Sequence, residues 1–173
     1  MLKLIYAPDP ILKKESVSIP QVDDHHRELI KQMYEIMYSA NGVGLAAPQI
    51  GLNIRIFVLD AGARDEEKKP ITMINPKIIS LHEKKVPYEE GCLSVPNQFA
   101  EIDRPKQCNV KYLDYNGQPQ ELKADGLLSI CIQHEIDHLE GILFIDYLSK
   151  LKKEMIIKKL SKQTKESVER IVV

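Results

Sequence analysis

Two histidines and a glutamate near the end of the chain could bind a metal ion and use it for hydrolysis. His134 and His138 are four residues apart, so on a helix their imidazoles lie one above the other on one face. Such a pair can hold one divalent metal, and Glu135 projects beside them, where its carboxylate reaches a water on that metal. Two nitrogens do not complete a site, so a third protein ligand is expected from elsewhere.

Cys92 is the candidate for the third ligand. Its thiolate would bind a divalent metal strongly, and Gly91 lets the backbone turn tightly enough to present it. Cys131 competes for this role, but it lies three residues before His134 on the same predicted helix, where it fits the wall of a pocket better. Most intracellular cysteines are buried apolar residues, and Cys108, among strand residues, is predicted to be one of them.

Composition predicts a single cytoplasmic domain. A chain of 173 residues can bury a core without disulfides, and three cysteines without framework spacing are typical of a reducing compartment. The opening sequence lacks the pattern of a secretory signal or transit peptide, and no apolar run approaches the roughly 20 residues that span a bilayer. The net charge of −1 argues against a DNA-binding protein. We therefore expect neither a membrane nor DNA as a partner.

Positive charge is concentrated at the C-terminal end. Residues 150–173 hold eight Lys/Arg against three Asp/Glu, whereas residues 1–149 hold 16 against 22. We therefore divide the chain into a catalytic part, 1–149, and a basic C-terminal helix or tail, 150–173, that packs on it or extends from it. Runs of charge usually form a solvated face, but this excess also suits contact with RNA phosphate.

Periodicity and turn residues predict the elements that position these groups. Helices are predicted at 23–41, 125–141 and from about 150 onward. Asp23 or Asp24 can cap the first helix, Asp125 the second, and Gly141 would end the second. Strands are predicted at 54–59, 71–74, 77–81, 110–115, 120–123 and 142–145, with a hairpin turn at 116–117 and a solvated loop at 64–69. This order indicates a single α+β domain: antiparallel or mixed β-sheets packed around a central metal-binding helix, with an N-terminal and a C-terminal helix.

The loop from Gly42 to Gln49 is a further candidate for ligand binding. Its small residues let a ligand approach the backbone closely, and Gln49 could donate its amide to a carbonyl oxygen that gains negative charge. Taken alone, the loop favours a simpler interpretation, in which Gln49 stabilises a turn. The glycines are a weak indication of a phosphate loop, because no Walker lysine follows them.

Three of these segments together resemble the signature motifs of peptide deformylases. They are Gly42-Val-Gly-Leu-Ala-Ala-Pro-Gln49, Glu90-Gly-Cys-Leu-Ser94 and Gln133-His-Glu-Ile-Asp-His138, in the order and approximate spacing of that family. The similarity also includes Pro8-Asp-Pro-Ile-Leu12 and Asn75-Pro76. The resemblance implies a hydrolase that removes the formyl group from the N-terminal N-formylmethionine of newly synthesised proteins and releases formate.

The resemblance also implies one divalent metal per chain. Cys92, His134 and His138 would hold it, and Glu135 would act as general base and then as the acid that protonates the departing amine. Members of the family use Fe²⁺, and Ni²⁺, Co²⁺ or Zn²⁺ can replace it in purified protein; a Cys/His₂ set tolerates all of these ions. A metal with one thiolate and two neutral imidazoles lowers the pKa of its water and leaves a position open for a carbonyl.

Roles at the substrate follow from the same resemblance. Gln49 and the backbone N–H of Leu93 would stabilise the tetrahedral oxyanion. Leu127, Ile130 and Cys131 share the helix face of His134 and would wall a pocket that suits an unbranched side chain such as methionine. The full set of expected substrate contacts is Val43, Gly44, Glu90, Gly91, Phe99, Arg104, Leu127, Ile130 and Cys131.

Phe99 is a departure from the family pattern. Many bacterial relatives have a basic residue there, so a hydrophobic rim would alter the peptide preference, while Arg104 remains as a basic residue nearby. Asp137 is expected to pair with a cation or to orient an imidazole. The partners that the resemblance implies are N-formylmethionyl nascent peptides and the ribosome, the latter through the basic C-terminal helix.

Two other classes of function stay open on the sequence alone. A zincin-type metalloprotease would share the two histidines and Glu135 but would take its third ligand downstream, from Glu154 or Glu166. A non-enzymatic structural-zinc or RNA-binding module would need a closed site with four ligands. No fourth Cys or His is placed to close such a site, since the three other histidines, His25, His26 and His82, are predicted to lie at the surface.

Overall fold

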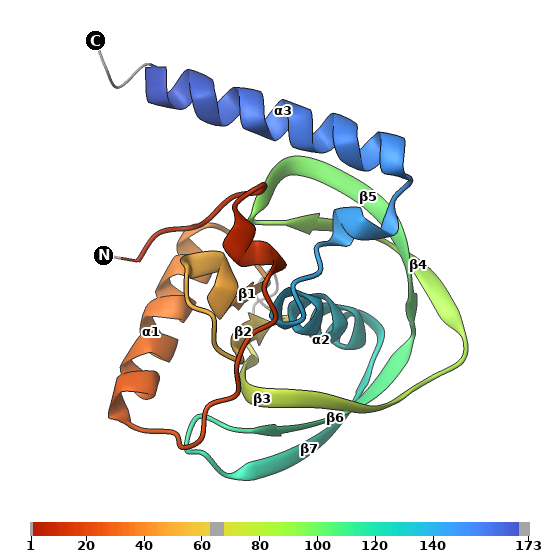
Figure 1. The fold of residues 1–173 in the computed structure, drawn as a ribbon. Helices are drawn as coiled ribbons and strands as arrows, with labels where there is room; N and C mark the ends of the chain where they lie inside the picture. Colours follow the sequence, from red (N-terminus) through yellow and green to blue (C-terminus); the bar gives the residue numbers. More distant parts are fainter. Residues whose placement is uncertain (1, 63–67, 170–173) are drawn as a thin grey trace.

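Two antiparallel sheets surround a central helix in the computed structural model, which describes the backbone of residues 2–62 and 68–169 and the side chains as far as residue 162 (Figure 1). The elements in chain order are η1 (Pro10–Lys13), α1 (Asp24–Ser39), β1 (Gly44–Ala46), η2 (Ala47–Ile50), β2 (Ile56–Asp60), β3 (Pro70–Leu81), β4 (Lys85–Cys92), β5 (Val95–Pro105), β6 (Gln107–Leu113), β7 (Pro119–Asp125), α2 (Gly126–Leu139), η3 (Phe144–Tyr147) and α3 (Lys150–Glu169), where η marks a 3-10 helix. The expected α+β class, with helices at both ends of the chain, is confirmed.

The larger sheet has the strand order β1-β2-β3-β6-β7, and β4 pairs with β5 in a separate hairpin. Strands β6 and β7 meet at the predicted turn, where Gly117 adopts a φ of 78° and Asp114 accepts hydrogen bonds from the amides of Asn116 and Gln118. A positive φ is readily adopted by glycine, which explains its place in this turn. The predicted hairpin is confirmed.

Helix α1 packs against the larger sheet through one apolar face. Asp23 caps it by accepting a hydrogen bond from the amide of His26 at 2.9 Å. Its buried side chains, Leu29, Ile30, Met33 and Met37, share a core with residues of β1 and β2. This packing fixes β1, which begins at Gly44, and the loop before it, which carries Gly42.

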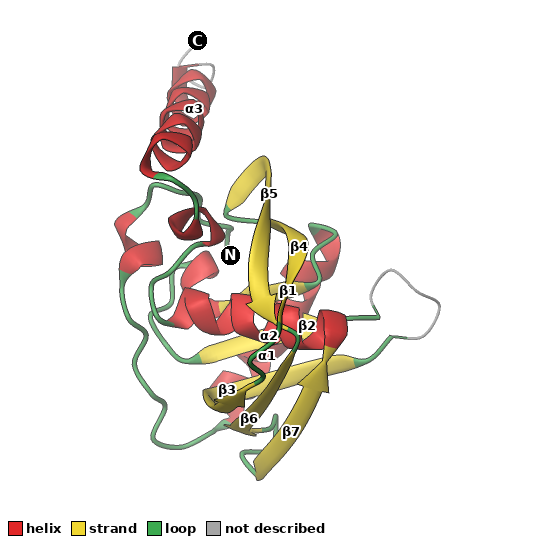
Figure 2. Ribbon diagram, turned by 90° about the vertical axis from the view of Figure 1, so that its right-hand side faces the viewer, coloured by secondary structure: helices red, strands yellow, loops and turns green. Residues whose placement is uncertain are grey.

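Helix α2 lies between the two sheets, and its apolar side chains enter a second core that includes Phe57, Met73 and Val110 (Figure 2). Asp125 occupies the N-cap position, as predicted, and its carboxylate accepts a hydrogen bond from Gln107 Nε2. Gly141 follows the helix with a φ of 71°, as predicted. A Cβ on Gly141 would lie 2.6 Å from the carbonyl oxygen of Lys13, so the helix end is packed against the N-terminal segment.

Several predicted elements need correction. The predicted loop 42–49 contains strand β1 and most of the 3-10 helix η2. The hairpin β4–β5 has no counterpart among the predicted elements. The predicted strands 71–74 and 77–81 form one strand, β3, which continues through Asn75 at a φ of 50° and an irregular register. The predicted strand 142–145 is wrong, because a 3-10 helix begins at Phe144. Residues 142–145 form a short apolar run without a period, and such a run does not distinguish a strand from a helical turn. Most of the predicted loop 64–69 lies outside the described residues.

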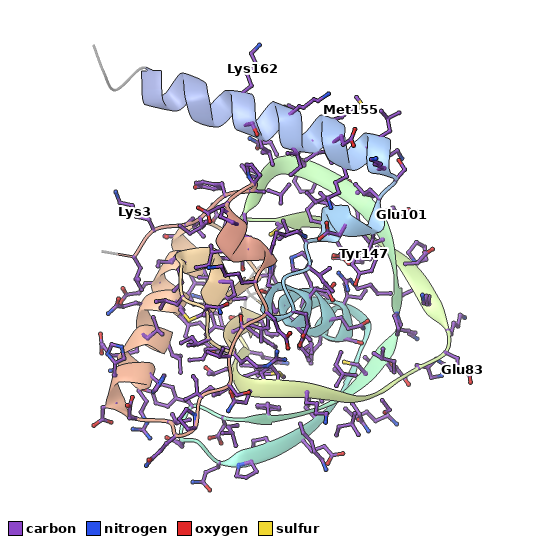
Figure 3. The ribbon with its side chains drawn as sticks, in the orientation of Figure 1. Lys3, Glu83, Glu101, Tyr147, Met155 and Lys162 are labelled. Carbon is purple, nitrogen blue, oxygen red and sulfur yellow. The ribbon has the colours of Figure 1, made fainter. Side chains whose placement is uncertain are left out.

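Helix α3 extends along the outside of the β4–β5 hairpin and projects away from the end of the molecule opposite β7 (Figures 1 and 2). Leu160 is buried, while Leu151 and Met155 are 69% and 62% exposed. Lys153 pairs with Asp146 at 2.6 Å, and Asp146 also pairs with Lys13 of the N-terminal segment. Met155 and Lys162 point outward (Figure 3). No helix among the described residues is both long and apolar enough to cross a bilayer.

Candidate metal centre

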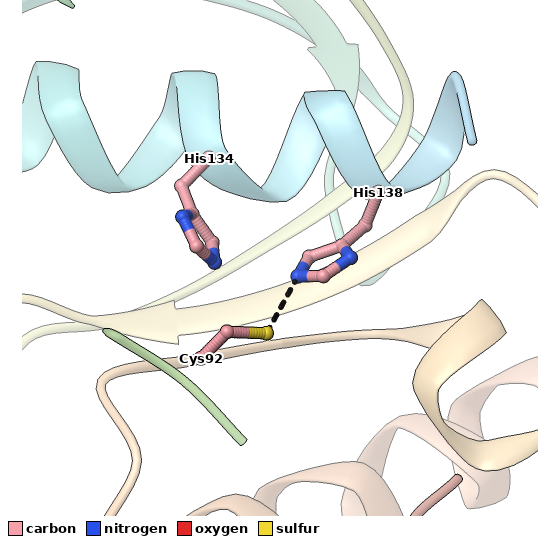
Figure 4. Close-up of side chains that lie close together, drawn as sticks. All are labelled: Cys92, His134 and His138. Atoms are coloured by element: carbon pink, nitrogen blue, oxygen red, sulfur yellow. Dashed lines mark hydrogen bonds between the residues drawn. The ribbon is translucent and has the colours of Figure 1, made fainter. Parts of the chain in front are cut away.

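Three side chains with metal-binding atoms meet beside α2. Cys92 Sγ, a nitrogen of His134 and a nitrogen of His138 all lie within 4.8 Å of one another (Figure 4). The distance from Cys92 Sγ to His138 Nε2 is 3.3 Å. The two imidazole rings project from successive turns of α2 with centroids 5.0 Å apart. The predicted trio of Cys92, His134 and His138 is therefore brought together in space.

This trio fits a divalent metal. Metal–sulfur and metal–nitrogen bonds of about 2.0 to 2.3 Å in a tetrahedral site separate neighbouring ligands by about 3.5 Å, close to the observed 3.3 Å between Cys92 Sγ and His138 Nε2. His138 is 1% exposed, and burial lowers its pKa well below the ordinary value, which favours the neutral form that binds metals. A thiolate and two imidazoles are the ligand types expected for iron, zinc, nickel or cobalt.

Cys92 is delivered by an irregular end of the β4–β5 hairpin. The register holds to Gly91 opposite Phe99 and then shifts, so that Cys92 faces Val95. A Cβ on Gly91 would lie 2.6 Å from a ring carbon of Phe99. A side chain at position 91 would therefore have to displace the Phe99 ring, which covers Gly91.

Glu90 holds the second nitrogen of His134. Its Oε2 lies 2.8 Å from His134 Nδ1, and its carboxylate also accepts from Nε and Nη2 of Arg104. Glu90 and Arg104 are each 4% exposed. Burial alone would raise the pKa of Glu90, but the hydrogen bonds from His134 and Arg104 outweigh it and lower that pKa. Glu90 and Arg104 were expected to contact the substrate, but they are buried behind His134 and pair with each other.

Asp137 and Tyr147 extend this buried ion pair. Asp137 Oδ2 accepts from Arg104 Nη1 at 2.8 Å and from the hydroxyl of Tyr147 at 2.9 Å. The expectation that Asp137 pairs with a cation is confirmed. The pKa of Arg104 would fall on burial, but its bonds to Glu90 and Asp137 raise it, so the guanidinium stays charged.

Glu135 is buried beside the trio with one carboxylate oxygen unpaired. It is 4% exposed, and among the described residues its Oε2 finds no hydrogen-bond partner. Burial raises its pKa to about 7. Its carboxylate lies against Gly44: a Cβ on that glycine would come within 2.7 Å of Glu135 Cδ and closer still to Oε1. A carboxylate with this pKa can both accept and donate a proton near neutral pH.

Gln49 faces the same trio from η2. Its Oε1 accepts from the amide of Ala46 at 2.8 Å, and its Nε2 donates to Ser94 Oγ at 3.2 Å and to Cys92 Sγ at 3.5 Å. The residue is 1% exposed. Gln49 therefore stabilises its own turn and also presents an N–H donor next to the thiol, so the two interpretations of this residue are compatible. Leu93 directly follows Cys92 and places its side chain near Gly42.

The other expected substrate contacts lie on α2, just before β1 and on β5. On α2, Ile130 is buried, Cys131 is half-buried and Leu127 is 38% exposed. Val43 directly precedes β1, and its carbonyl accepts from the amide of Asp60 at 2.8 Å. Phe99 is 68% exposed, although its ring edge covers Gly91.

Two residues near the centre had no predicted role. Ser94 is fully buried and receives a hydrogen bond from Gln49, and its signal was its place in the Cys-Leu-Ser segment. Tyr147 had no sequence signal, because its contact with Asp137 depends on how η3 folds back over α2.

The geometry does not support the two alternative classes. Glu154 is exposed on α3. The metal-binding group that the described side chains form consists of Cys92, His134 and His138 and does not include Glu154. Glu166 lies among the side chains outside the description. That group holds three ligands, whereas a closed structural zinc site needs four.

Comparison with known proteins gives the same assignment. Residues 1–154 match the family described as polypeptide deformylase. A peptide deformylase of Pelagibacter ubique is 56% identical over 159 residues, covering 92% of each chain, and one of Rhizobium meliloti is 49% identical over 162 residues, covering 94% of this chain and 93% of its own. The crystal structure of peptide deformylase from Ehrlichia chaffeensis superposes with a TM-score of 0.92 at 40% identity, covering 97% of this chain and 99% of that one. The chain therefore belongs to the polypeptide deformylase family.

Proposed function

We propose that this chain hydrolyses the formamide bond of N-formylmethionyl nascent peptides, with one divalent metal held by Cys92, His134 and His138. The observation that carries this proposal is the meeting of that trio with the buried carboxylate of Glu135, which has an unpaired oxygen and a pKa of about 7. We also propose that the enzyme works in the cytoplasm, where nascent chains emerge. Fe²⁺ is the metal that we propose for the native enzyme, by likeness to the family.

The metal, when bound, supplies a Lewis acid and lowers the pKa of its water. Glu135 accepts a proton from the attacking water and then donates it to the departing amine, for which a pKa near neutral pH is suited. Gly44 leaves the room that this carboxylate occupies. Burial keeps bulk water away from Glu135, so its proton is passed to the substrate and not to solvent.

Two donors stabilise the negative charge that grows on the formyl oxygen. The first donor is Gln49 Nε2, which lies 3.5 Å from Cys92 Sγ. The second is the backbone N–H of Leu93, the residue that directly follows Cys92. One fixed donor of this kind contributes about 3 kcal/mol to transition-state stabilisation. Because Ala46 and Ser94 hold both ends of the Gln49 amide, the donor is oriented before the substrate arrives.

The remaining residues divide into two groups. Val43, Leu127, Ile130 and Cys131 form the walls for the methionine side chain, and Phe99 forms an apolar rim for the peptide beyond it. Glu90 and Arg104 lie too deep for substrate contact and act on His134 instead: the carboxylate of Glu90 holds the proton on Nδ1, which leaves Nε2 to bind the metal.

The test is formate release from a formyl-Met peptide by anaerobically purified protein, with Glu135→Ala beside it and bound metal measured in both. We expect rapid release by the wild type and a loss of at least about a hundredfold in the variant at equal metal content. Loading with Fe²⁺, Ni²⁺, Co²⁺ or Zn²⁺ in turn would rank the metals. A fully metallated wild type that releases no formate would contradict the proposal.

We also propose that 150–173 is a docking element distinct from the catalytic part, 1–149, and that it meets the RNA of the ribosome. The support is its excess of positive charge and the exposure of most of its described lysines, which are Lys150, Lys152, Lys158, Lys159 and Lys162. Because Leu160 is buried, replacing exposed lysines is a cleaner test than deleting the helix. Changing Lys152, Lys158 and Lys159 to Glu should weaken salt-sensitive ribosome binding while turnover of a short peptide is kept; unchanged binding would refute the docking role.

A further inference from the structure

Tyr147 ends a continuous series of hydrogen bonds that starts at His134. Its hydroxyl donates to Asp137 Oδ2 at 2.9 Å, and the same oxygen accepts from Arg104 Nη1 at 2.8 Å. Arg104 Nη2 donates to Glu90 Oε2 at 3.0 Å, and that oxygen lies 2.8 Å from His134 Nδ1. The series therefore leads from η3 at the surface to the back of an imidazole in the metal centre.

The ring of Tyr147 also covers the middle of this series. The guanidinium carbon of Arg104 lies 5.1 Å from the ring centroid. The side chains of Arg104 and Asp137 are 5% and 16% exposed, whereas Tyr147 itself is 52% exposed. Tyr147 thus stands between solvent and a charged network, and ionic hydrogen bonds that are shielded from water are stronger and better defined in geometry.

We propose that Tyr147 is a positioning residue for the hydrolytic reaction. It acts through Asp137 and Arg104 on Glu90, and Glu90 sets the tautomer and the orientation of His134. This inference rests on the proposed role of His134 as a metal ligand.

The argument depends on what each group needs from the next. His134 can offer Nε2 to a metal only while its proton stays on Nδ1, and Glu90 Oε2 is the acceptor that lies within hydrogen-bond distance of that nitrogen. The fork of Arg104 holds Glu90 in place, and Asp137 anchors the remaining Nη1 of that fork. Without the Tyr147 hydroxyl, Asp137 Oδ2 loses its second donor, and water reaches the position that the hydroxyl filled.

The test compares Tyr147→Phe with wild type in two measurements: the rate at which a chelator removes the metal, and kcat and KM for a formyl-Met peptide. Removing a group that directly holds a metal ligand costs about 10- to 100-fold in metal affinity or activity, and Tyr147 acts at a greater distance, so we expect metal loss to be about three- to tenfold faster. We expect kcat to fall by a similar factor and KM to stay unchanged. The matched control is Tyr6→Phe, since Tyr6 is 48% exposed and lies outside this network.

A double-mutant comparison tests the route. In an Asp137→Asn background, Tyr147→Phe should change the rate of metal loss by less than about 1.5-fold, because the acceptor that it serves has already been altered. An unchanged rate of metal loss in the single variant, or a full effect that persists without Asp137, would overturn the proposal. Metal loss is measured without substrate, so this result stands apart from the outcome of the formate assay.

Discussion

Replacing Gly44 with Ala should disable the enzyme by pushing Glu135 out of place. The new methyl carbon would lie 2.7 Å from Glu135 Cδ and 3.1 Å from Cγ. Carbon atoms in favourable contact are about 3.5 to 4.0 Å apart, so the carboxylate has to move by about 1 Å. Gly44 does not have a positive φ, so alanine is compatible with the backbone there and the damage is confined to the carboxylate.

A displacement of this size has a large kinetic effect. Misplacing a reacting group by about 1 Å can cost about a hundredfold in rate, which corresponds to about 2.7 kcal/mol in activation free energy. The assay is kcat for formate release at saturating peptide, with metal content and thermal unfolding measured on the same samples. We expect kcat to fall by about a hundredfold while the metal is retained and the fold stays intact.

Two comparisons decide whether the cause is Glu135. A Cβ on Gly42 would meet the end of the flexible Leu93 side chain at 2.8 Å, so Gly42→Ala should cost less than about tenfold. In a Glu135→Ala background, Gly44→Ala should have little further effect on kcat, because the group that it displaces is absent. A Gly44→Ala enzyme with more than a third of wild-type kcat, or an equal loss in both backgrounds, would refute this reasoning.

Three further changes have expected outcomes. Glu90→Gln should speed metal loss to a chelator by about 10- to 100-fold, because the ionised acceptor for His134 is lost; an unchanged rate would contradict that role. Phe99→Arg should raise kcat/KM by about three- to tenfold for peptides with an acidic residue after methionine relative to those with leucine, and an unaltered ratio would exclude Phe99 from the substrate rim. Burial alone would raise the pKa of Asp146, but Lys13 and Lys153 lower it, so its stabilising contribution is full above the ordinary carboxyl pKa and is lost as pH falls through the lower folded-state value. The difference in unfolding free energy between wild type and Asp146→Asn should therefore shrink as the pH falls below the ordinary carboxyl pKa of 3.8; a constant difference would contradict this assignment.

Much of the fold could be predicted from local pattern. The cap at Asp23, the turn at Gly117 and the helix end at Gly141 each depend on the backbone of a few neighbouring residues, and all three are confirmed. The β4–β5 hairpin could not be predicted in the same way, because apolar and polar residues do not alternate cleanly along its strands: in β5 the apolar Phe99 is exposed and the charged Arg104 is buried. Phe144 was wrongly assigned to a strand, because a short buried apolar run is compatible with a strand and with a 3-10 helix.

The metal ligands could be predicted because each lies in a short sequence motif. The spacing of His134 and His138 fixes their common face, and Cys92 was found through the motif around it. Glu90 and Arg104 were placed at the substrate because sequence order cannot show that Arg104 of β5 turns inward to pair with Asp137 of α2. The burial of an ion pair is a property of packing between elements, and no local signal reports it.

The junction of Gly141 with the N-terminal segment bears on when the enzyme can become active during its own synthesis. The metal trio draws on β4 and α2, and the end of α2 is sealed against Lys13, more than a hundred residues earlier in the chain. A growing chain cannot assemble these parts until α2 has left the ribosome, because a metal site does not exist before its ligands have been folded together. Until then the part of the chain outside the ribosome contains Cys92 but lacks the complete trio, so it cannot hold an oxidation-prone metal–thiolate centre before the protein that shields this centre has emerged.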